Sequence, residues 1–379
     1  MADVVVVGAG VIGASVAWHL ARHGVRPLIL ERENAPGQGS TGRATGGFRA
    51  QYATGINVRL SLLAREKLRR FEAETGVDPG YAPYGYLWLA RTGAQLQALR
   101  AAQELQRAAG LHEAHMLDLA GIREVNPHVR TEGLAGAAFC PTDGFIRPLD
   151  ILRGYLRGAE VRTNARVVGL RRRGERIEAV RLGDGTEIAA GAVVDAAGPW
   201  AGPVARLAGV DLPVAPLRRQ VGSTIDTSVL PATMPMTVWV EDALHVRPRD
   251  GRVLLVWPTP GDPRDPESTA LEPGWLEEVR RRAVARVPAL AQVPADPSRS
   301  WAGLYEMSPD QHALLGPAPG CENLYLCNGS SGHGVMHSPA LGQLLAEIIV
   351  HGEARSLDVG PLRPSRFAEG QPNPVSDLL

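Results

Sequence analysis

Four consecutive valines, residues 4–7, lie near the start of the chain, and three spaced glycines, Gly8, Gly10 and Gly13, follow them at once. A run of valines favours a strand that is buried on both of its faces. The glycines have the G-x-G-x-x-G spacing, in which the first permits a tight turn, the second lets backbone approach a pyrophosphate and the third packs a helix on the strand. The helix that follows, through Leu20, would point its N-terminus at phosphate groups. The sequence therefore predicts a dinucleotide-binding unit at this point.

A second predicted strand, residues 27–31, ends at Glu31. In this kind of unit, a carboxylate at the end of the second strand accepts hydrogen bonds from a ribose. The order of strand, glycine turn, helix, strand and acid is more specific than the glycine spacing alone. An ordinary βα turn that is rich in small residues is the alternative interpretation.

Charge and composition exclude several classes of partner. Lys plus Arg and Asp plus Glu each number 40, so no overall field attracts nucleic acid or an anionic membrane. The apolar runs are shorter than the roughly 18 residues of a membrane-spanning helix. The N-terminus lacks the basic stretch of a secretory signal. We therefore expect a soluble cytoplasmic protein with no nucleic-acid partner and no membrane contact.

The cysteines and the single lysine limit the possible chemistry further. Cys140, Cys321 and Cys327 are odd in number and have no C-x-x-C spacing, so they indicate neither a zinc site nor a disulfide framework. We expect three buried thiols and no metal. Lys67 is the single lysine of the chain, which limits the cationic groups that can lie beside a cofactor.

A passage rich in glycine and serine, residues 36–49, follows the second predicted strand. Loops of this length between regular elements tend to be functional. Its small residues would let backbone lie against a flat ligand, and Ser40 and Thr41 offer hydroxyl groups. We expect this loop to contribute to the same site.

The remaining pattern divides the chain into two kinds of region. Periodicity predicts helices over residues 58–74, 94–109, 277–287 and 339–350, with short strands over 84–90, 161–200 and 213–256. We predict an α/β fold with a discontinuous Rossmann-like domain and an α+β substrate domain whose sheet is mainly antiparallel. The Rossmann-like domain would comprise residues 1–80, 143–211 and 316–379, and the substrate domain residues 81–142 and 212–315.

Four segments in this order resemble the flavoenzyme family that includes D-amino-acid oxidase, glycine oxidase, sarcosine oxidase and the catalytic subunits of proline dehydrogenases. They are the glycine motif with Glu31, the loop 40–49, Val-Val-Asp-Ala-Ala-Gly-Pro-Trp at 193–200 and Gly-Ser-Ser-Gly-His-Gly-Val-Met-His-Ser-Pro-Ala-Leu-Gly at 329–342. The resemblance covers nearly the whole chain and implies that the cofactor is FAD rather than NAD.

The resemblance also implies which residues contact FAD. The glycines at 8, 10 and 13 would hold the pyrophosphate, Glu31 the adenosine ribose and Val167 the adenine edge, while residues 43–46 and 332–336 would flank the flavin ring. The full set is Gly8, Ala9, Gly10, Val11, Ile12, Gly13, Glu31, Arg32, Ser40, Thr41, Arg43, Ala44, Thr45, Gly46, Val167, Ala197, Gly198, Trp200, Gly332, His333, Gly334, Val335 and Met336. A glycine-rich turn before a helix at Pro339 would present backbone N–H groups and a positive dipole end to the negatively charged reduced flavin.

For the substrate, the resemblance implies a small amino acid that is oxidised at its C–N bond. Sarcosine oxidases bind the substrate carboxylate through an arginine just after the small-residue loop, and Arg49 matches that position. A guanidinium suits a carboxylate because it donates two parallel hydrogen bonds. A surface arginine on a long loop is the alternative for Arg49. His333, Tyr305 and His245 are the candidates for a catalytic base.

Three departures from the family pattern affect the prediction. Gly303 lies where monomeric sarcosine oxidases carry the cysteine that attaches FAD, so we expect non-covalent FAD. Met336 replaces a second carboxylate-binding lysine. The lysine credited with activating oxygen is absent from the strand around Leu254 and Leu255.

Molecular oxygen, giving hydrogen peroxide, or a redox partner therefore remain the two possible electron acceptors. An amino-acid oxidase is our first expectation and a proline- or sarcosine-type dehydrogenase subunit the alternative. A non-catalytic FAD-containing scaffold or assembly subunit is a further alternative, and an NAD-dependent dehydrogenase would require the glycine motif without the later flavin segments.

Overall fold

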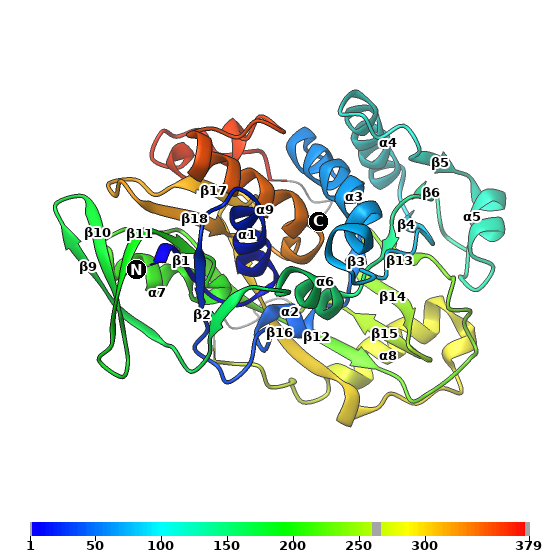
Figure 1. Cartoon of the computed structure of the whole chain (residues 1–379). Helices are drawn as coiled ribbons and strands as arrows, with labels where there is room; N and C mark the ends of the chain where they lie inside the picture. The colour runs from blue at the N-terminus through cyan, green and yellow to red at the C-terminus, as the bar shows by residue number, and fades with distance from the viewer. Residues whose placement is uncertain (1, 260–266, 376–379) are drawn as a thin grey trace.

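The computed structural model describes residues 2–259 and 267–375. Two eight-stranded sheets dominate the fold, and a short two-stranded sheet accompanies them (Figure 1). The first sheet consists of β1 (Ala2–Val7), β2 (Pro27–Leu30), β8 (Glu160–Arg162), β9 (Val167–Arg173), β10 (Arg176–Leu182), β11 (Glu187–Asp195), β17 (Leu314–Pro317) and β18 (Leu324–Asn328).

The strand of valines, β1, lies at the centre of the first sheet. It pairs in parallel with β2 on one side and β11 on the other, and β8 and β18 extend the parallel order. Residues 4–7 are all buried, as the valine run predicts. Strand β17 adds an antiparallel edge, and β9 and β10 form an antiparallel hairpin that continues from β11.

Two helices from opposite ends of the chain pack together over this sheet (Figure 1). They are α1 (Val11–Arg22) and α9 (Gly334–His351). Ser15 Oγ on α1 donates a hydrogen bond of 2.7 Å to the carbonyl of Ser338 on α9. A Cβ at Gly342 would lie 2.7 Å from the Ser15 backbone, so glycine is required for this close approach.

The second sheet is built from the middle of the chain. In sheet order its strands are β16 (Trp301–Met307), β12 (Ala215–Ser223), β15 (Arg252–Val256), β14 (Leu244–Arg249), β13 (Met236–Trp239), β4 (Tyr86–Ala90), β6 (Gly136–Cys140) and β5 (His115–Leu117). All of its neighbours pair antiparallel except β13 with β4. The predicted α/β fold with a mainly antiparallel second sheet is confirmed.

The remaining helices surround the two sheets (Figure 1). They are α2 (Ser40–Arg43), α3 (Gly55–Thr75), α4 (Gly93–Ala108), α5 (Leu119–Val125), α6 (Pro148–Tyr155), α7 (Ala201–Arg206) and α8 (Trp275–Arg286). The predicted helices 58–74, 94–109 and 277–287 correspond to α3, α4 and α8, within a few residues at each end. The strands of the first sheet lie in the segments predicted for the Rossmann-like domain, except that β17 begins two residues before the predicted boundary at 316. The strands of the second sheet lie in the segments predicted for the substrate domain. The domain boundaries stay a prediction, and parts of them, residues 1, 260–266 and 376–379, lie outside the described residues.

Two local predictions were wrong. The helix expected from Pro339 begins at Gly334, with Pro339 inside it. Pro339 is the sixth residue of this helix, so it lacks the N–H that would bond to the Val335 carbonyl. Ser338 Oγ donates to that carbonyl at 2.9 Å instead. The passage 36–49 is not wholly irregular either, because it contains α2 and the short strand β3 (Gly47–Phe48), which pairs with β7 (Gly144–Phe145).

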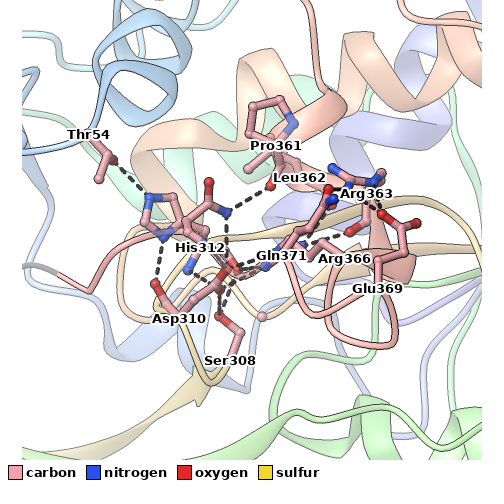
Figure 2. Close-up of polar contacts among 12 residues, drawn as sticks. Thr54, Ser308, Asp310, His312, Pro361, Leu362, Arg363, Arg366, Glu369 and Gln371 are labelled. Atoms are coloured by element: carbon pink, nitrogen blue, oxygen red, sulfur yellow. Dashed lines mark hydrogen bonds and ion pairs between the residues drawn. The ribbon is translucent and has the colours of Figure 1, made fainter.

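A buried ion pair fastens the C-terminal segment to the loop between β16 and β17 (Figure 2). Arg366 donates from Nε and Nη2 to the two carboxylate oxygens of Asp310, each at 2.8 Å. The bound arginine lowers the pKa of Asp310, although burial opposes this effect. His312 then contacts Thr54, before α3, with 2.8 Å between Nε2 and Oγ1. Among the described residues, no helix is long and apolar enough to cross a membrane.

Candidate active site

A cavity of about 850 Å³ lies between the two sheets, where β1, β2 and β11 end. Its wall includes residues from the first sheet, such as Val7 and Leu30, and from the second, such as His245 and Tyr305. Cavities at the carboxyl ends of parallel strands are the usual ligand sites of open α/β sheets. All four predicted catalytic residues line it, as do all residues predicted to contact the cofactor except Ala9 and Gly13.

The glycine turn after β1 is too crowded for side chains. Gly8 has φ +106°, and a Cβ there would lie 2.6 Å from the carbonyl oxygen of Ala196. A Cβ at Gly13 would lie 2.1 Å from the carbonyl oxygen of Gly8. Gly13 therefore packs α1 against the turn from behind, while Gly10 leaves backbone exposed on the cavity wall. These are the positions at which the spacing demands glycine.

Glu31 follows β2 and lies at the cavity wall. Its Oε2 accepts a hydrogen bond of 2.9 Å from the Ala9 amide, and its Oε1 accepts one of 2.9 Å from the Glu33 amide. Each carboxylate oxygen can accept more than one bond, so capacity for a ribose hydroxyl remains. Next to it, the Arg32 guanidinium stacks on the Trp200 ring at 3.8 Å, and both residues line the cavity.

Residues after β11 and at the start of β9 form a further part of the cavity wall. Val167, Ala197 and Gly198 all line the cavity. Gly198 has φ +58° and begins a short 3₁₀ helix. The buried Asp195 at the end of β11 accepts a hydrogen bond of 3.0 Å from the Ala197 amide, so its carboxyl group holds this turn.

The small-residue loop is anchored to the second sheet. Ser40 Oγ donates to the carbonyl of Leu304 at 2.7 Å, and the Val11 amide donates to Thr41 Oγ1 at 3.1 Å. Arg247 donates to the carbonyl of Thr45, and Arg249 Nη1 donates to the carbonyl of Ala44 at 3.1 Å. The loop thereby bridges the glycine turn and strands β14 and β16.

The turn before α9 forms another part of the cavity wall. Gly332 has φ +92°, and a Cβ there would lie 2.6 Å from the ring of Tyr305. Residues 332–336 all line the cavity, so the N-terminus of the 18-residue helix α9 faces it. A helix N-terminus stabilises negative charge because its first N–H groups have no partner within the helix.

Arg49 lines the cavity, and only 4% of its surface is exposed. Its Nη1 donates to the carbonyl of Gln51 at 2.8 Å. The guanidinium also lies over the ring of Tyr52, 4.0 Å from its centre, and 5.1 Å from the ring centre of Trp88. These aromatic faces favour the cation without neutralising it.

His333 contacts Arg49 directly, with 3.2 Å between Nε2 and Nη2. A guanidinium can only donate, so Nε2 accepts and the neutral ring carries its proton on Nδ1. Burial, with the positive charge of Arg49, holds the pKa of His333 well below its usual range. His333 is therefore a neutral imidazole that orients Arg49.

His245 is the second imidazole of the cavity. Its Nδ1 lies 2.7 Å from the carbonyl oxygen of Ala243, which can only accept, so Nδ1 carries the proton. The lone pair of Nε2 accepts no hydrogen bond from the residues that the structure describes. Burial lowers the pKa of His245 to about 4. Tyr305 is 36% exposed and lies in the lining beside the cavity.

Several residues of the site could not be found from the sequence. Asp143 is fully buried and accepts hydrogen bonds from the amide of Ala50 at 2.8 Å and the side-chain amide of Gln51 at 3.2 Å, which holds the segment carrying Arg49. Burial raises the pKa of Asp143 to about 6. Arg247 lies within β14, and Glu306 is the last residue but one of β16. Strand alternation was the available signal, and it does not tell which face lines a cavity.

The cavity fits an extended dinucleotide. Its volume lies within the roughly 300–1,000 Å³ typical of small-molecule and cofactor sites. The cradle at Gly8 and Gly10 and the N-termini of α1 and α9 suit a ligand with a pyrophosphate and a second electron-rich group. None of the three cysteines is among the cavity residues, and no cluster of His, Cys, Asp or Glu in the described ranges could hold a metal ion.

Comparisons with known proteins agree with this geometry. The family model described as "FAD dependent oxidoreductase" matches residues 3–348. "FAD-dependent oxidoreductase domain-containing protein 1" of Bos taurus is 28% identical, over 97% of this chain and 85% of that protein. "4-methylaminobutanoate oxidase (formaldehyde-forming)" of Paenarthrobacter nicotinovorans is also 28% identical over 97% of this chain, which spans 46% of that protein. The solved L-proline dehydrogenase from P. horikoshii superposes with a TM-score of 0.90, at 25% identity, over 98% of this chain and 99% of that one.

Proposed function

Because the chain belongs to the FAD dependent oxidoreductase family, with FAD as its cofactor, we propose that it oxidises the C–N bond of a secondary or N-methyl amino acid. Sarcosine is the simplest member of this substrate class. The product is an imine, which water converts to an amine and a carbonyl compound. FAD, when bound, accepts the two electrons that the substrate gives up.

Arg49 supports this proposal most directly. It is a buried cation on the wall of the cavity, and within the described ranges no carboxylate lies within 4.0 Å of its guanidinium. A buried charge without a counter-ion is costly, so a ligand that supplies one is strongly favoured. An amino-acid carboxylate supplies it in a planar form that accepts two parallel hydrogen bonds.

The surroundings of Arg49 orient such a substrate. His333 and the Gln51 carbonyl hold part of the guanidinium and fix its plane, and its remaining N–H groups would bind the carboxylate. Fixing the carboxylate in one place restricts the rest of a small amino acid, which converts binding energy into rate.

The amine must be neutral when the C–N bond is oxidised, so its ammonium proton needs an acceptor. Nε2 of His333 already accepts from Arg49, whereas Nε2 of His245, in the cavity wall, has no hydrogen-bond donor among residues 2–259 and 267–375. We therefore assign the hydrogen bond with the substrate nitrogen to His245. Tyr305, at the exposed side of the site, shapes the entrance.

The names of the similar proteins support a substrate whose nitrogen is methylated or part of a ring: one is a methylaminobutanoate oxidase and one a proline dehydrogenase. By their names, the oxidase and the dehydrogenase differ in electron acceptor, as do the two alternatives for this chain. We propose molecular oxygen as the acceptor. Lys67, the single lysine, lies on α3 away from the cavity, which favours a dehydrogenase using another acceptor as the second candidate.

A visible spectrum of the holoprotein without oxygen tests the proposal. Sarcosine, other N-methyl amino acids, proline and glycine are added in turn, and air is then admitted. Bleaching of the flavin by an N-methyl or secondary amino acid is the expected result, and rapid return of the colour in air identifies oxygen as the acceptor. Slow return identifies a dehydrogenase. A yellow protein that none of them bleaches contradicts the proposal and favours a non-catalytic subunit.

Arg49→Met separates substrate binding from cofactor binding. The variant should keep its flavin but need about 100-fold more amino acid for half-maximal bleaching, because a buried charge-assisted pair is lost. Arg70→Met, on the exposed surface of α3, is the control and should behave as the wild type. If Arg49→Met needs the same amino-acid concentration for half-maximal bleaching as the wild type, Arg49 does not bind the substrate carboxylate.

A further inference from the structure

Glu306 is a buried acid in the cofactor cavity that the proposed reaction does not use. It follows Tyr305 on β16, is 8% exposed and lines the cavity. Its Oε1 accepts a hydrogen bond of 3.2 Å from the Ser330 amide, and its backbone carbonyl accepts one of 2.9 Å from the Ser331 amide. One half of the carboxyl group thus holds the turn that leads to α9.

The other carboxyl oxygen of Glu306, Oε2, differs in its hydrogen bonding. In the part of the chain that the structure describes, the buried Oε2 has no hydrogen-bond partner. A Cβ built on Gly198 would lie 3.7 Å from this oxygen, which places Oε2 on the side of Gly198. Gly198 lines the same cavity. Buried polar atoms in native proteins almost always have a partner, so a ligand in the cavity is the natural one.

The surroundings of Glu306 favour its neutral form. Burial raises the pKa of Glu306 to about 7. The ionisable groups near it are Asp195, at the end of β11, and Cys327, on β18, and burial raises the pKa of each of these well above its usual range. No ion pair to Glu306 occurs within residues 2–259 and 267–375. The carboxyl group therefore has an O–H to donate around neutral pH.

We propose that Glu306 binds FAD as a neutral acid, its Oε2 hydroxyl donating a hydrogen bond to an oxygen of the cofactor beside Gly198. FAD carries a negatively charged pyrophosphate, so an ionised carboxylate facing it would repel it, whereas a protonated one donates to it. FAD affinity should then fall as Glu306 ionises. This role concerns the cofactor alone and holds whichever amine is oxidised.

Reconstitution of the apoprotein with FAD tests this role without any substrate. Quenching of FAD fluorescence gives the dissociation constant between pH 6 and pH 8.5 for the wild type, Glu306→Gln and Glu306→Leu. The wild type should bind FAD about tenfold more weakly at the upper pH. Glu306→Gln keeps an uncharged donor, so it should bind close to the wild type at pH 6 and show much less dependence on pH. Glu306→Leu should bind about tenfold more weakly at pH 6.

Glu322→Gln, at an exposed glutamate outside the cavity, is the matched control and should follow the wild type throughout. Circular dichroism of each apoprotein checks that it is folded. If Glu306→Leu does not fold, the comparison of wild type with Glu306→Gln still decides. Identical pH dependence in these two proteins, or loss of FAD from Glu306→Gln at pH 6, overturns the proposal.

Discussion

Arg49 and His333 are separated by most of the chain, yet Nη2 of the guanidinium lies 3.2 Å from Nε2 of the imidazole. Arg49 follows the small-residue loop, and His333 is the N-cap residue of α9. The Tyr52 ring contacts both, lying 4.0 Å from the Arg49 guanidinium and, edge on, 4.9 Å from the His333 ring. The contact joins the two segments on which the proposed substrate site depends, and it requires His333 to be neutral.

Replacing His333 tests this orientation. His333→Ala removes the acceptor for Arg49 and should raise the KM for the amino acid about tenfold, because a hydrogen bond to a charged group is lost. His333→Gln offers a carbonyl acceptor and should recover most of that loss. The pKa of His333 is lowered, so wild type and His333→Gln should have the same pH profile of kcat/KM between pH 5.5 and 8. An inflection near pH 6.5 in the wild type alone would show that the imidazole titrates.

The glycine turn should be intolerant of a single methyl group. Gly13→Ala places a Cβ 2.1 Å from the Gly8 carbonyl oxygen, so α1 must shift away from the turn that supports the cofactor. We expect a destabilisation of about 1–3 kcal/mol and loss of bound FAD. The ratio of flavin to protein absorbance and the Tm measure the two effects. Gly93→Ala, at the start of α4, is the control, because a Cβ at this position would have no neighbouring atom within 4 Å. This variant should keep its flavin.

The buried pair Asp310–Arg366 should dominate the anchoring of the C-terminal segment. Arg366→Met leaves the Asp310 carboxylate buried without its cation, which costs about 3–5 kcal/mol. Urea unfolding measures this loss. Arg26→Gln removes the exposed pair with Asp3 and should change stability little. Equal effects of the two substitutions would contradict the importance of burial.

Acid should destabilise the fold partly through His337. This buried residue lies 2.8 Å, Nε2 to Oγ, from Ser61, and burial lowers its pKa to about 3. Between pH 6.5 and that value the unfolded chain binds a proton that the folded chain does not, so the stabilisation is present above pH 6.5 and lost as pH falls. The contribution of His337 to the slope should approach about 1.4 kcal/mol per pH unit around pH 5, in addition to the contributions of the other buried histidines.

Urea unfolding at several pH values checks this slope. His337→Gln keeps a polar partner for Ser61 but cannot be protonated, so its stability should fall less steeply with acid. The exposed His115 provides the control, since His115→Gln should leave the slope of the wild type unchanged. Parallel slopes for wild type and His337→Gln would mean that His337 is not responsible.

The sequence by itself determined the features that depend on neighbours along the chain. The valine strand, the glycine turn and the helix after it are local, because glycine alone fits a left-handed or crowded backbone position. The fold class, the family and FAD as the cofactor were predicted from such segments and are confirmed. The roles of Arg49, Tyr305, His245 and the flavin-flanking residues stay predictions.

The tertiary structure decided what depends on contacts between distant segments. Only the packing of β14 and β16 beside the loop brings Arg247 and Glu306 to the cavity wall, and only the fold brings Asp143 to the amide of Ala50, next to Arg49 in the chain. The same packing sets the tautomers of His333 and His245, and the proposed hydrogen bond of His245 with the substrate nitrogen rests on these tautomers. Burial and hydrogen-bond partners fix these protonation states, and neither is written in local sequence.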